Sequence, residues 1–579
     1  MPTQAYPANL GTSGGLTWPL NTNSGTNDSY IHPDYSSLGN AAKRHATMVR
    51  RIDTCMGDIL QTLRDLNIAD NTLVIFTSDN GTHDEPGAGG SVAHNPRNFD
   101  SFGILEGIKR DTWEGGIRMP TFAWWPTKIG DNNSATPGAN SMRPSAFWDW
   151  MPTIVDAAGA VPPAWSTGVS LLPELTTTGT QLDKGYLYFE YNVGSSTPNY
   201  TEFPNHGGDT RGQMQAIFMD DTDGKRYKGI RTGISNHSKN FEIYDVDLDP
   251  AEGNNLAASK ATLQQKMKDK VLQVRIDGDY NRGYMSNEFA PAVTGVSTTG
   301  GLRYKAFTGS WNWVPETDYL TPVANGDCIN LDLSKRTQND NIALEFTGYI
   351  SVPSDGTYTF QMSADSGVNT NTSGAMMWIH DAHVIDDDFQ HDGSTKSGTM
   401  RLKAGKHPIR VLYKHGTGGH DIDLKYSGPG LPLQSVPDSA FSRDGAAGPL
   451  PIANPDGAST TGTTPVTIPV LANDTDDGAP SALSIQSVGT PNFGTVVING
   501  ASINYTANAG KYGIDQFTYT ITDGANTATA TVTVNVRVNS TDLWYPLNET
   551  SGSVVHEAGG SPDGSHAGIA DSQAAHIVG

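Results

Sequence analysis

Residues 72–81 read TLVIFTSDNG, and this stretch decides the fold of the first part of the chain. Its beginning, 72–77, is a continuous apolar run, which is typical of a buried strand in a parallel sheet. Residues 40–66 carry apolar side chains at intervals of three and four and therefore predict an amphipathic helix. A helix, a short turn and a buried strand together form one unit of an α/β sheet.

Polar residues follow at the end of this strand. In open α/β sheets, ligands gather beyond the carboxyl ends of the strands, so Asp79 and Asn80 lie where chemistry is expected. By itself, Asp-Asn-Gly after a strand is more often a turn than a metal site. The glycine-rich loop that follows contains His83 and His94, for which a pocket-lining role and a solvated position are both open.

Composition limits the function classes. The 579 residues are too many for one core and indicate three or four domains. The formal net charge of −23 argues against nucleic acid as a partner, because little basic surface is left for phosphates. No apolar run approaches the roughly 20 residues that span a bilayer. The two cysteines, Cys55 and Cys328, fall in different predicted domains, so no disulfide is expected between them.

Two further motifs accompany the run at 73–81. One is KRDTWEGGIR at 109–118, and the other is IYDVDLDP at 243–250, followed by NNL at 254–256. In this order and spacing, the three motifs resemble those of the type I sulfatases of the alkaline phosphatase superfamily. The resemblance implies an α/β fold with an incomplete mixed sheet, flanking helices and a small C-terminal β-rich subdomain.

The resemblance also assigns roles to particular residues. Asp79 and Asn80 match the pair that binds a single divalent metal, usually calcium, for which carboxylate and amide oxygens are suitable ligands. Lys109 matches the lysine that contacts the sulfate oxygens, where it would stabilise negative charge in the transition state. The remaining matched residues are expected to form a structural turn: Glu114, Gly115, Gly116 and Arg118.

Two family elements are not found in this sequence. Sulfatases carry an Asp-Asp metal pair near the start of the domain and a C/S-x-P/A-x-R motif whose Cys or Ser becomes formylglycine. Cys55 is followed by Met-Gly-Asp and Cys328 by Ile-Asn-Leu, and no serine fits the motif either. We therefore expect the nucleophile and a signal peptide in a missing N-terminal part, an incomplete calcium site here, and no activity from this chain alone.

The secondary structure expected around these motifs includes a helix at 144–158 and a β-rich part at 185–275 that closes with a helix at 260–275. Further along, the pattern changes to alternating strands and turns. Three more modules are suggested by ALEFTGYISVPSDGTYTF, VLAND and LWYPLNETSG, which resemble a protective-antigen-type β-barrel, a cadherin-like or Ig-like sandwich, and a laminin-G or concanavalin-like domain.

The expected order of parts is a C-terminal sulfatase portion at 1–285, a linker at 286–299, the β-barrel domain at 300–442, a linker at 443–456, the β-sandwich at 457–537, and a truncated laminin-G-like start at 538–579. In the β-barrel domain, Asp365 lies in the loop that holds calcium in some glycan-binding relatives, with Asp386, Asp387 and Asp388 nearby. Glycan binding and a spacer with solvated acidic loops are equally open.

These observations predict an exported, extracellular or periplasmic sulfatase that acts on sulfated polysaccharides. One alternative is a non-catalytic carbohydrate-binding or surface adhesion protein with a degenerate sulfatase part. A second alternative is a phosphatase or phosphodiesterase of the same superfamily, which would hold two metals. The Asp-Asn-Gly element and the Lys109 block favour the single-metal sulfatase over that second alternative.

Overall fold

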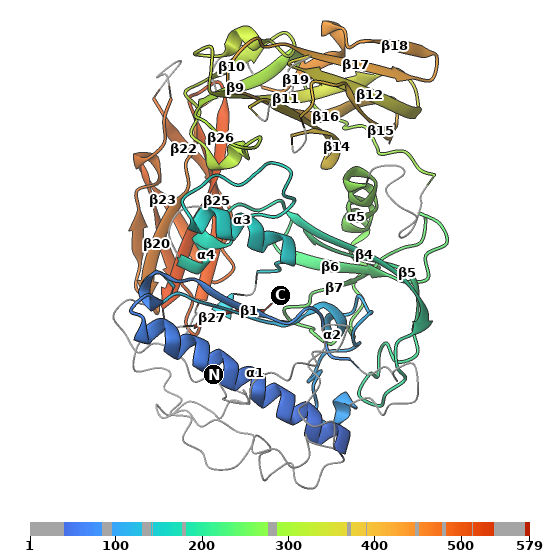
Figure 1. Ribbon diagram of the computed structural model, residues 1–579, viewed down its shortest axis with the longest axis vertical. Helices are drawn as coiled ribbons and strands as arrows, with labels where there is room; N and C mark the ends of the chain where they lie inside the picture. Colours follow the sequence, from blue (N-terminus) through green and yellow to red (C-terminus); the bar gives the residue numbers. More distant parts are fainter. Residues whose placement is uncertain are drawn as a thin grey trace.

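The structure is a computed structural model, and the chain forms three adjoining parts (Figure 1). It describes residues 40–83, 95–129, 140–141, 143–176, 181–275, 287–366, 372–388, 391–445, 451–476, 482–511, 513–537 and 574–578. Within these residues, no helix combines the length and the apolar composition needed to cross a bilayer.

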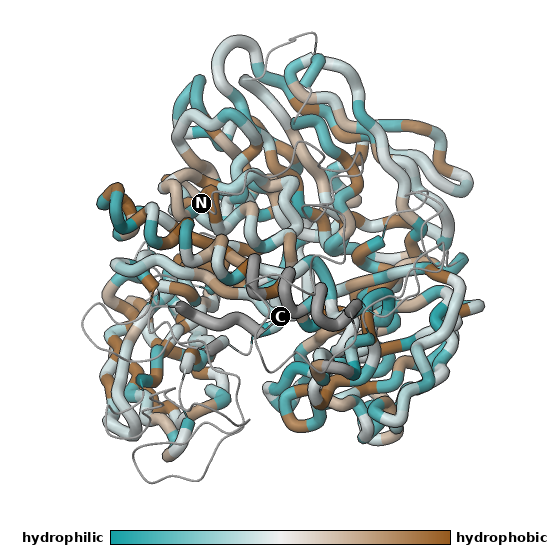
Figure 2. The backbone as a smooth tube through the Cα atoms, turned by 60° about the horizontal axis from the view of Figure 1, so that its bottom comes forward, coloured by the Kyte–Doolittle hydropathy of each residue, from teal (hydrophilic) through white to brown (hydrophobic). Residues whose placement is uncertain are grey.

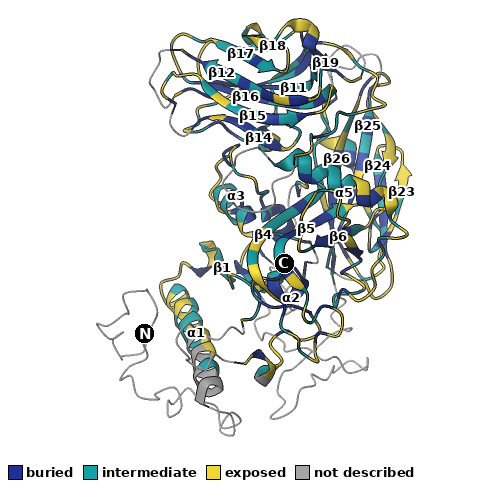
Figure 3. Cartoon of the chain, turned by 90° about the vertical axis from the view of Figure 1, so that its right-hand side faces the viewer, coloured by how far each residue is buried: buried dark blue, intermediate teal, exposed yellow. Residues whose placement is uncertain are grey.

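The predicted first helix is confirmed as α1 (Asn40–Asp65). Its apolar side is not buried, however, because Ile52 and Ile59 are each about half exposed, at 50% and 51%. Cys55 on the same helix is half-buried and forms no disulfide with Cys328, as expected. Figure 3 shows α1 at the edge of the molecule, where little of its surface is covered by other described elements.

The strand that follows is present, but the predicted parallel pairing is wrong. β1 (Val74–Thr77) pairs antiparallel with β2 (Pro120–Trp124), and all of its residues are half-buried. The sheet continues through β27 (Ala574–Val578) to β3 (Asn140–Ser141). A continuous apolar run indicates burial on both faces but does not fix the direction of the neighbouring strand, and here the neighbour is the strand that returns from the 109–118 motif.

The predicted β-rich subdomain and its closing helix are confirmed. An antiparallel sheet contains β4 (Tyr186–Ser196), β5 (Thr210–Asp220), β6 (Arg226–Arg231) and β7 (Glu242–Tyr244), in that order. Helix α5 (Ala261–Val274) covers one face through a buried apolar cluster. The opposite face packs on Trp113 of the second motif. The short helices are α2 (Glu114–Ile117), α3 (Phe147–Ala157), which matches the helix predicted at 144–158, and α4 (Leu172–Thr176).

The next part is a β-sandwich rather than the expected barrel. An 8-stranded sheet and a 4-stranded sheet pack face to face around one apolar core, and neither closes on itself within the described residues. The strands are β8 (Thr299–Gly300), β9 (Leu302–Thr308), β10 (Ala324–Cys328), β11 (Ile342–Val352), β12 (Gly356–Ala364), β13 (Gly374–Ile379), β14 (Ala382–Asp387), β15 (Lys396–Leu402), β16 (Gly405–His415), β17 (Ile422–Gly428), β18 (Leu431–Ser435) and β19 (Phe441–Arg443).

A second, smaller sandwich follows, as predicted. Its two sheets have the orders β20-β26-β25-β22 and β21-β24-β23, with β20 parallel to β26. Figure 2 shows hydrophilic and apolar segments alternating along the backbone, which is expected for strands with one buried face. The strands are β20 (Asp456–Thr461), β21 (Val466–Ile468), β22 (Ser484–Val488), β23 (Gly494–Asn499), β24 (Ser502–Ala507), β25 (Gly513–Thr522) and β26 (Thr527–Arg537).

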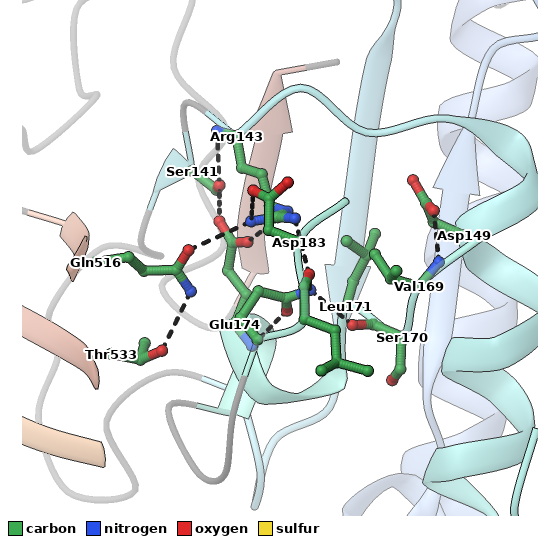
Figure 4. Close-up of polar contacts among 12 residues, drawn as sticks. Ser141, Arg143, Asp149, Val169, Ser170, Leu171, Glu174, Asp183, Gln516 and Thr533 are labelled. Carbon is green, nitrogen blue, oxygen red and sulfur yellow. Dashed lines mark hydrogen bonds and ion pairs between the residues drawn. The ribbon is translucent and has the colours of Figure 1, made fainter. Parts of the chain in front are cut away.

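The guanidinium of Arg143 joins the α/β part to this smaller sandwich (Figure 4). It pairs with Asp183 at 2.9 Å and lies 3.6 Å from the buried carboxylate of Glu174. It also donates to Oε1 of Gln516 on β25 at 3.3 Å. Burial raises the pKa of Glu174, and the nearby Arg143 opposes that shift. One cation therefore stabilises two carboxylates and contacts the neighbouring sandwich.

Replacing this cation tests its importance. Arg143→Met leaves the Glu174 carboxylate buried without its counter-charge, so we expect the free energy of unfolding to fall by about 3 kcal/mol. Gln516→Ala removes the inter-domain hydrogen bond and one bond within the sandwich, to Oγ1 of Thr533 at 3.1 Å, and should cost about 1–2 kcal/mol. Urea unfolding of both variants measures the difference. Equal losses would mean that the contact with the sandwich, and not the charge pairing, carries the effect.

Candidate functional site

The loop after β1 and the 106–118 block lie directly against each other. The backbone N–H of Gly81 donates to the carbonyl of Gly116 at 2.9 Å, and the N–H of Lys109 donates to the carbonyl of Thr82 at 2.7 Å. The first two sequence motifs are therefore one local structure. Both are held by main-chain hydrogen bonds, so the arrangement does not depend on flexible side chains.

Glycines allow this close approach. A Cβ atom on Gly81 would lie 1.9 Å from the carbonyl oxygen of Gly115, and one on Gly115 would lie 2.2 Å from that of Gly107. Backbone is packed on backbone at both positions, so no side chain can give way. The glycine pair in the second motif therefore has a packing role, as the sequence predicts for a structural turn.

Asp79 and Asn80 stand at the end of β1, as predicted. Asp79 is exposed, and Asn80 is half-buried and donates its Nδ2 to the carbonyl of Gly81 at 2.9 Å. That bond uses only the amide nitrogen, so the amide oxygen can still act as a ligand. Both residues line a pocket of about 260 Å³ whose other walls include the aromatic side chains of Phe147 and Trp148.

These two residues fit part of a calcium shell. They offer carboxylate and amide oxygens, whereas calcium takes six to eight oxygen ligands. Among the described residues, no group of three or more His, Cys, Asp or Glu side chains could hold a metal ion. His83 is exposed on the same loop, and His94 lies outside the described residues. The calcium site therefore remains a prediction.

A buried ion pair between Arg211 and Asp111 contacts the backbone of Lys109. Nε of Arg211 on β5 donates to Oδ1 of Asp111 at 2.7 Å, and its Nη2 donates to Oδ2 at 3.1 Å. The same Nη2 reaches the carbonyl of Lys109 at 3.4 Å. Over the described ranges, no hydrogen bond or ion pair engages Nζ of Lys109, so the ammonium is available to an anion.

A buried charge cluster joins the second motif to the third. Nζ of Lys228 on β6 lies 2.6 Å from Oε1 of Glu114 and 2.8 Å from Oε1 of Glu252. Glu252 also accepts from the backbone N–H of Glu114 at 2.7 Å. Nη1 of Arg118 lies 3.6 Å from Oε2 of Glu114, so this arginine also contacts the cluster.

Sequence reasoning did not find Lys228 or Glu252. Glu252 lies between IYDVDLDP and NNL of the third motif, and its φ of 53° is unusual for a non-glycine residue. Its place inside the third motif was the one feature of the sequence that could have indicated a role for Glu252. Lys228 sits in the middle of an ordinary strand, where nothing in the sequence distinguishes it from a surface lysine.

A loop from the β-rich subdomain covers the other side of the block. Glu106 is buried and accepts from the backbone N–H groups of Asn205 at 3.0 Å and His206 at 2.6 Å. The ring of His206 stacks on Trp113 with 3.5 Å between the centroids. No local sequence pattern predicts this contact, because Glu106 and His206 lie 100 positions apart.

Three of the four acidic residues singled out in the large sandwich are buried rather than solvated. Asp365 is 1% exposed and accepts from Oη of Tyr413 at 2.7 Å and from a ring nitrogen of His415 at 2.8 Å. Asp387 and Asp388 are buried as well, and Asp386 alone of the three is exposed. The carboxylate of Asp365 is therefore part of the internal packing of this domain.

The close backbone approach yields a direct test. Gly81→Ala places a methyl group against the Gly115 carbonyl, so we expect a loss of more than about 2 kcal/mol in the free energy of unfolding. Gly57→Ala is the matched control, because nothing lies within 4 Å of the added Cβ on α1. It should gain about 0.5–1 kcal/mol from helix propensity. Thermal unfolding distinguishes the two; similar shifts would contradict the packing argument.

The charge cluster predicts a pH dependence. Burial raises the pKa of Glu252 from 4.5 to about 7, although Lys228 opposes the shift. The folded protein therefore binds this proton more tightly than the unfolded chain. The resulting stability is complete below pH 4.5 and is lost as the pH rises through 7. We expect that loss to be on the order of 1–3 kcal/mol.

Glu252→Gln removes the titrating group, so the loss of stability over this pH range should shrink. The exposed Asp53→Asn serves as the control and should keep the parent profile. Urea unfolding at a series of pH values measures both. A Glu252→Gln profile that matches the parent would show that another group titrates.

Three family descriptions match parts of the chain. They are Sulfatase over residues 14–160, PA14 domain over 329–439 and Bacterial Ig domain over 449–535. The human N-acetylgalactosamine-6-sulfatase is 31% identical over 248 residues, which cover 41% of this chain and 44% of that protein. Rat steryl-sulfatase is 41% identical over 113 residues, covering 19% and 18%.

A bacterial relative, the N-acetylgalactosamine-6-O-sulfatase of Bacteroides thetaiotaomicron, is 24% identical and covers 43% of this chain and 46% of its own. The crystal structure of Ps i-CgsB is 20% identical, with a TM-score of 0.31 and coverage of 44% of this chain and 47% of that one. The chain spans less than half the length of these relatives. It thus joins a sulfatase segment to a PA14 domain and a bacterial Ig domain.

Proposed function

We propose that the sulfatase segment is the C-terminal portion of a catalytic domain that hydrolyses sulfate esters on polysaccharides. The observation that carries this proposal is the direct contact between the loop of Asp79 and Asn80 and the block of Lys109. Lys109 does not line the pocket beside Asp79 and Asn80, but its backbone is bonded to the loop that carries them. Oxygen ligands for a cation and an available ammonium group thus belong to two joined segments, and that combination suits a sulfate group.

Each residue has a distinct part in this proposal. Asp79 and Asn80 would hold a divalent cation, which supplies polarisation of the sulfate when bound. The Lys109 ammonium would contact a sulfate oxygen and stabilise the charge that develops there. Its position depends on the buried Arg211–Asp111 pair behind it. The nucleophile of the family, a formylglycine, has no C/S-x-P/A-x-R motif in these 579 residues.

The substrate proposal rests on the relatives and on the attached domains. The human and Bacteroides relatives are both named for removal of sulfate from an amino sugar. The PA14 and Ig domains add surfaces that suit a polymeric, extracellular or periplasmic substrate. A sulfated polysaccharide is therefore favoured over a small sulfate ester. The rival is a non-catalytic carbohydrate-binding protein, which the absence of the nucleophile motif from the sequence favours.

Sulfate release tests these alternatives. The chain alone should release no sulfate from sulfated galactosaminoglycans, because it lacks the nucleophile motif. The same chain joined to a sulfatase segment that carries a matured Cys-x-Pro-x-Arg motif should release it. In that joined protein, Asp79→Ala and Lys109→Ala should each lower the rate by about 100-fold or more. Lys128→Ala, at an exposed lysine, is the matched control and should leave the rate unchanged.

Two outcomes would contradict parts of the proposal. Sulfate release by the chain alone, abolished by Asp79→Ala, would place the nucleophile in these 579 residues. A joined protein that is folded, supplied with calcium and still inactive on sulfated polysaccharides would favour the non-catalytic alternative.

A further inference from the structure

A second cavity lies where the sulfatase part meets the PA14 domain. Its volume is about 880 Å³, and it is bordered by β4 and α5 on one side and by β13, β14 and β15 on the other. Sites of this size, roughly 300–1,000 Å³, are typical of small-molecule ligands and often lie at domain interfaces. We call this space the interdomain cleft.

The interdomain cleft and the candidate catalytic pocket lie on opposite faces of β4. Side chains alternate along a strand. Tyr186 and Tyr188 accordingly line the interdomain cleft, whereas Leu187 and Phe189 line the pocket beside Asp79. The two cavities share no lining residue, so the cleft is a separate site.

Fixed contacts between the two parts define the walls of the cleft. The backbone N–H of Ala164 donates to the carbonyl of Val314 at 2.9 Å. On the α5 side, Nζ of Lys270 lies 2.6 Å from a carboxylate oxygen of Asp381. Contacts at both places hold the cleft open at a set width, which reduces the ordering cost of binding a ligand.

Aromatic rings supply the apolar surface of the cleft. Trp165 is 43% exposed and borders the cavity, so its ring is open to a ligand. Trp378, by contrast, is stacked on His383 at 4.8 Å and has Arg410 over its ring at 5.3 Å. The lining also includes Tyr188, whose Oη donates to Glu190 at 2.6 Å. An open indole beside hydroxyl and carboxylate groups matches a ring with one apolar face and polar edges, as in a sugar.

The charges of the cleft select against an anionic ligand. Six carboxylates and four Lys or Arg side chains line it. All four basic groups are already engaged: Arg410 with Glu345 at 2.7 Å, Arg275 with Glu190 at 3.1 Å, Lys184 with a backbone carbonyl at 2.7 Å, and Arg401 with Oδ1 of Asn287 at 3.2 Å. Carboxylates of the cleft are paired as well, Asp183 with Arg143 and Asp381 with Lys270. A sulfate group entering here would therefore find few available cations to balance its charge.

We infer that the interdomain cleft binds a neutral oligosaccharide, such as an unsulfated stretch of a polysaccharide, with Trp165 stacked on a sugar ring. This binding does not depend on sulfatase activity or on calcium. The protein would then have a second glycan-binding site, on the opposite face of β4 from the candidate catalytic pocket. A chain with mixed sulfation could then be held by its neutral part.

Calorimetric titration of the full chain tests this inference. The probes are neutral tetrasaccharides of galactose, glucose and N-acetylgalactosamine, each paired with its 6-sulfated counterpart. At least one neutral probe should bind, and its sulfated counterpart should bind at least fivefold more weakly. Trp165→Ala should weaken binding at least tenfold, whereas Trp165→Phe, which keeps an aromatic ring, should weaken it less.

Tyr191→Ala is the matched control, since Tyr191 lies on the same strand, is 46% exposed and does not line the cleft. It should bind the neutral probe as tightly as the parent chain. The inference is overturned if no neutral probe binds, if the sulfated counterpart binds equally well or better, or if Trp165→Ala binds like the parent. Circular dichroism and thermal unfolding confirm that each variant is folded.

Discussion

The ammonium group of Lys228 is the point on which the sulfatase segment depends. It is fully buried between two carboxylates, one from the second sequence motif and one from the third. Removing a partner from a buried ion pair is strongly destabilising, because it leaves a buried charge without compensation. The turn at 114–116 is thereby fixed to the β-rich subdomain. The carbonyl of Gly116 in this turn accepts a hydrogen bond from the backbone N–H of Gly81. This bond sets the position of the neighbouring Asp79 and Asn80.

The same subdomain positions both cavities. Its sheet is covered by α5 on one face and by the 109–118 block on the other, and β4 separates the interdomain cleft from the candidate catalytic pocket. Alternation of side chains along one strand therefore gives two chemically different surfaces. One presents Leu187 and Phe189 beside oxygen ligands, and the other presents tyrosines beside paired charges.

Periodicity and motif order predicted a good part of this arrangement. The three-and-four spacing predicted α1, and the polar residues after an apolar run predicted where Asp79 and Asn80 stand. The predicted parallel pairing of β1 was wrong, because an apolar run indicates burial but not the direction of the neighbouring strand. The half-exposed face of α1 was also unexpected, since spacing shows which side chains share a face but not whether another element covers it.

The residues that the sequence did not reveal share one physical property. Lys228, Glu252 and Glu106 are all buried polar groups whose partners lie far away along the chain. Local pattern treats such residues as surface charges, because most charged side chains are exposed. Such groups can be buried only because the fold brings their hydrogen-bond donors and acceptors together through tertiary contacts. Candidate ligands at strand ends can therefore be found from sequence, whereas the groups that hold those ligands in place become visible only in the folded chain.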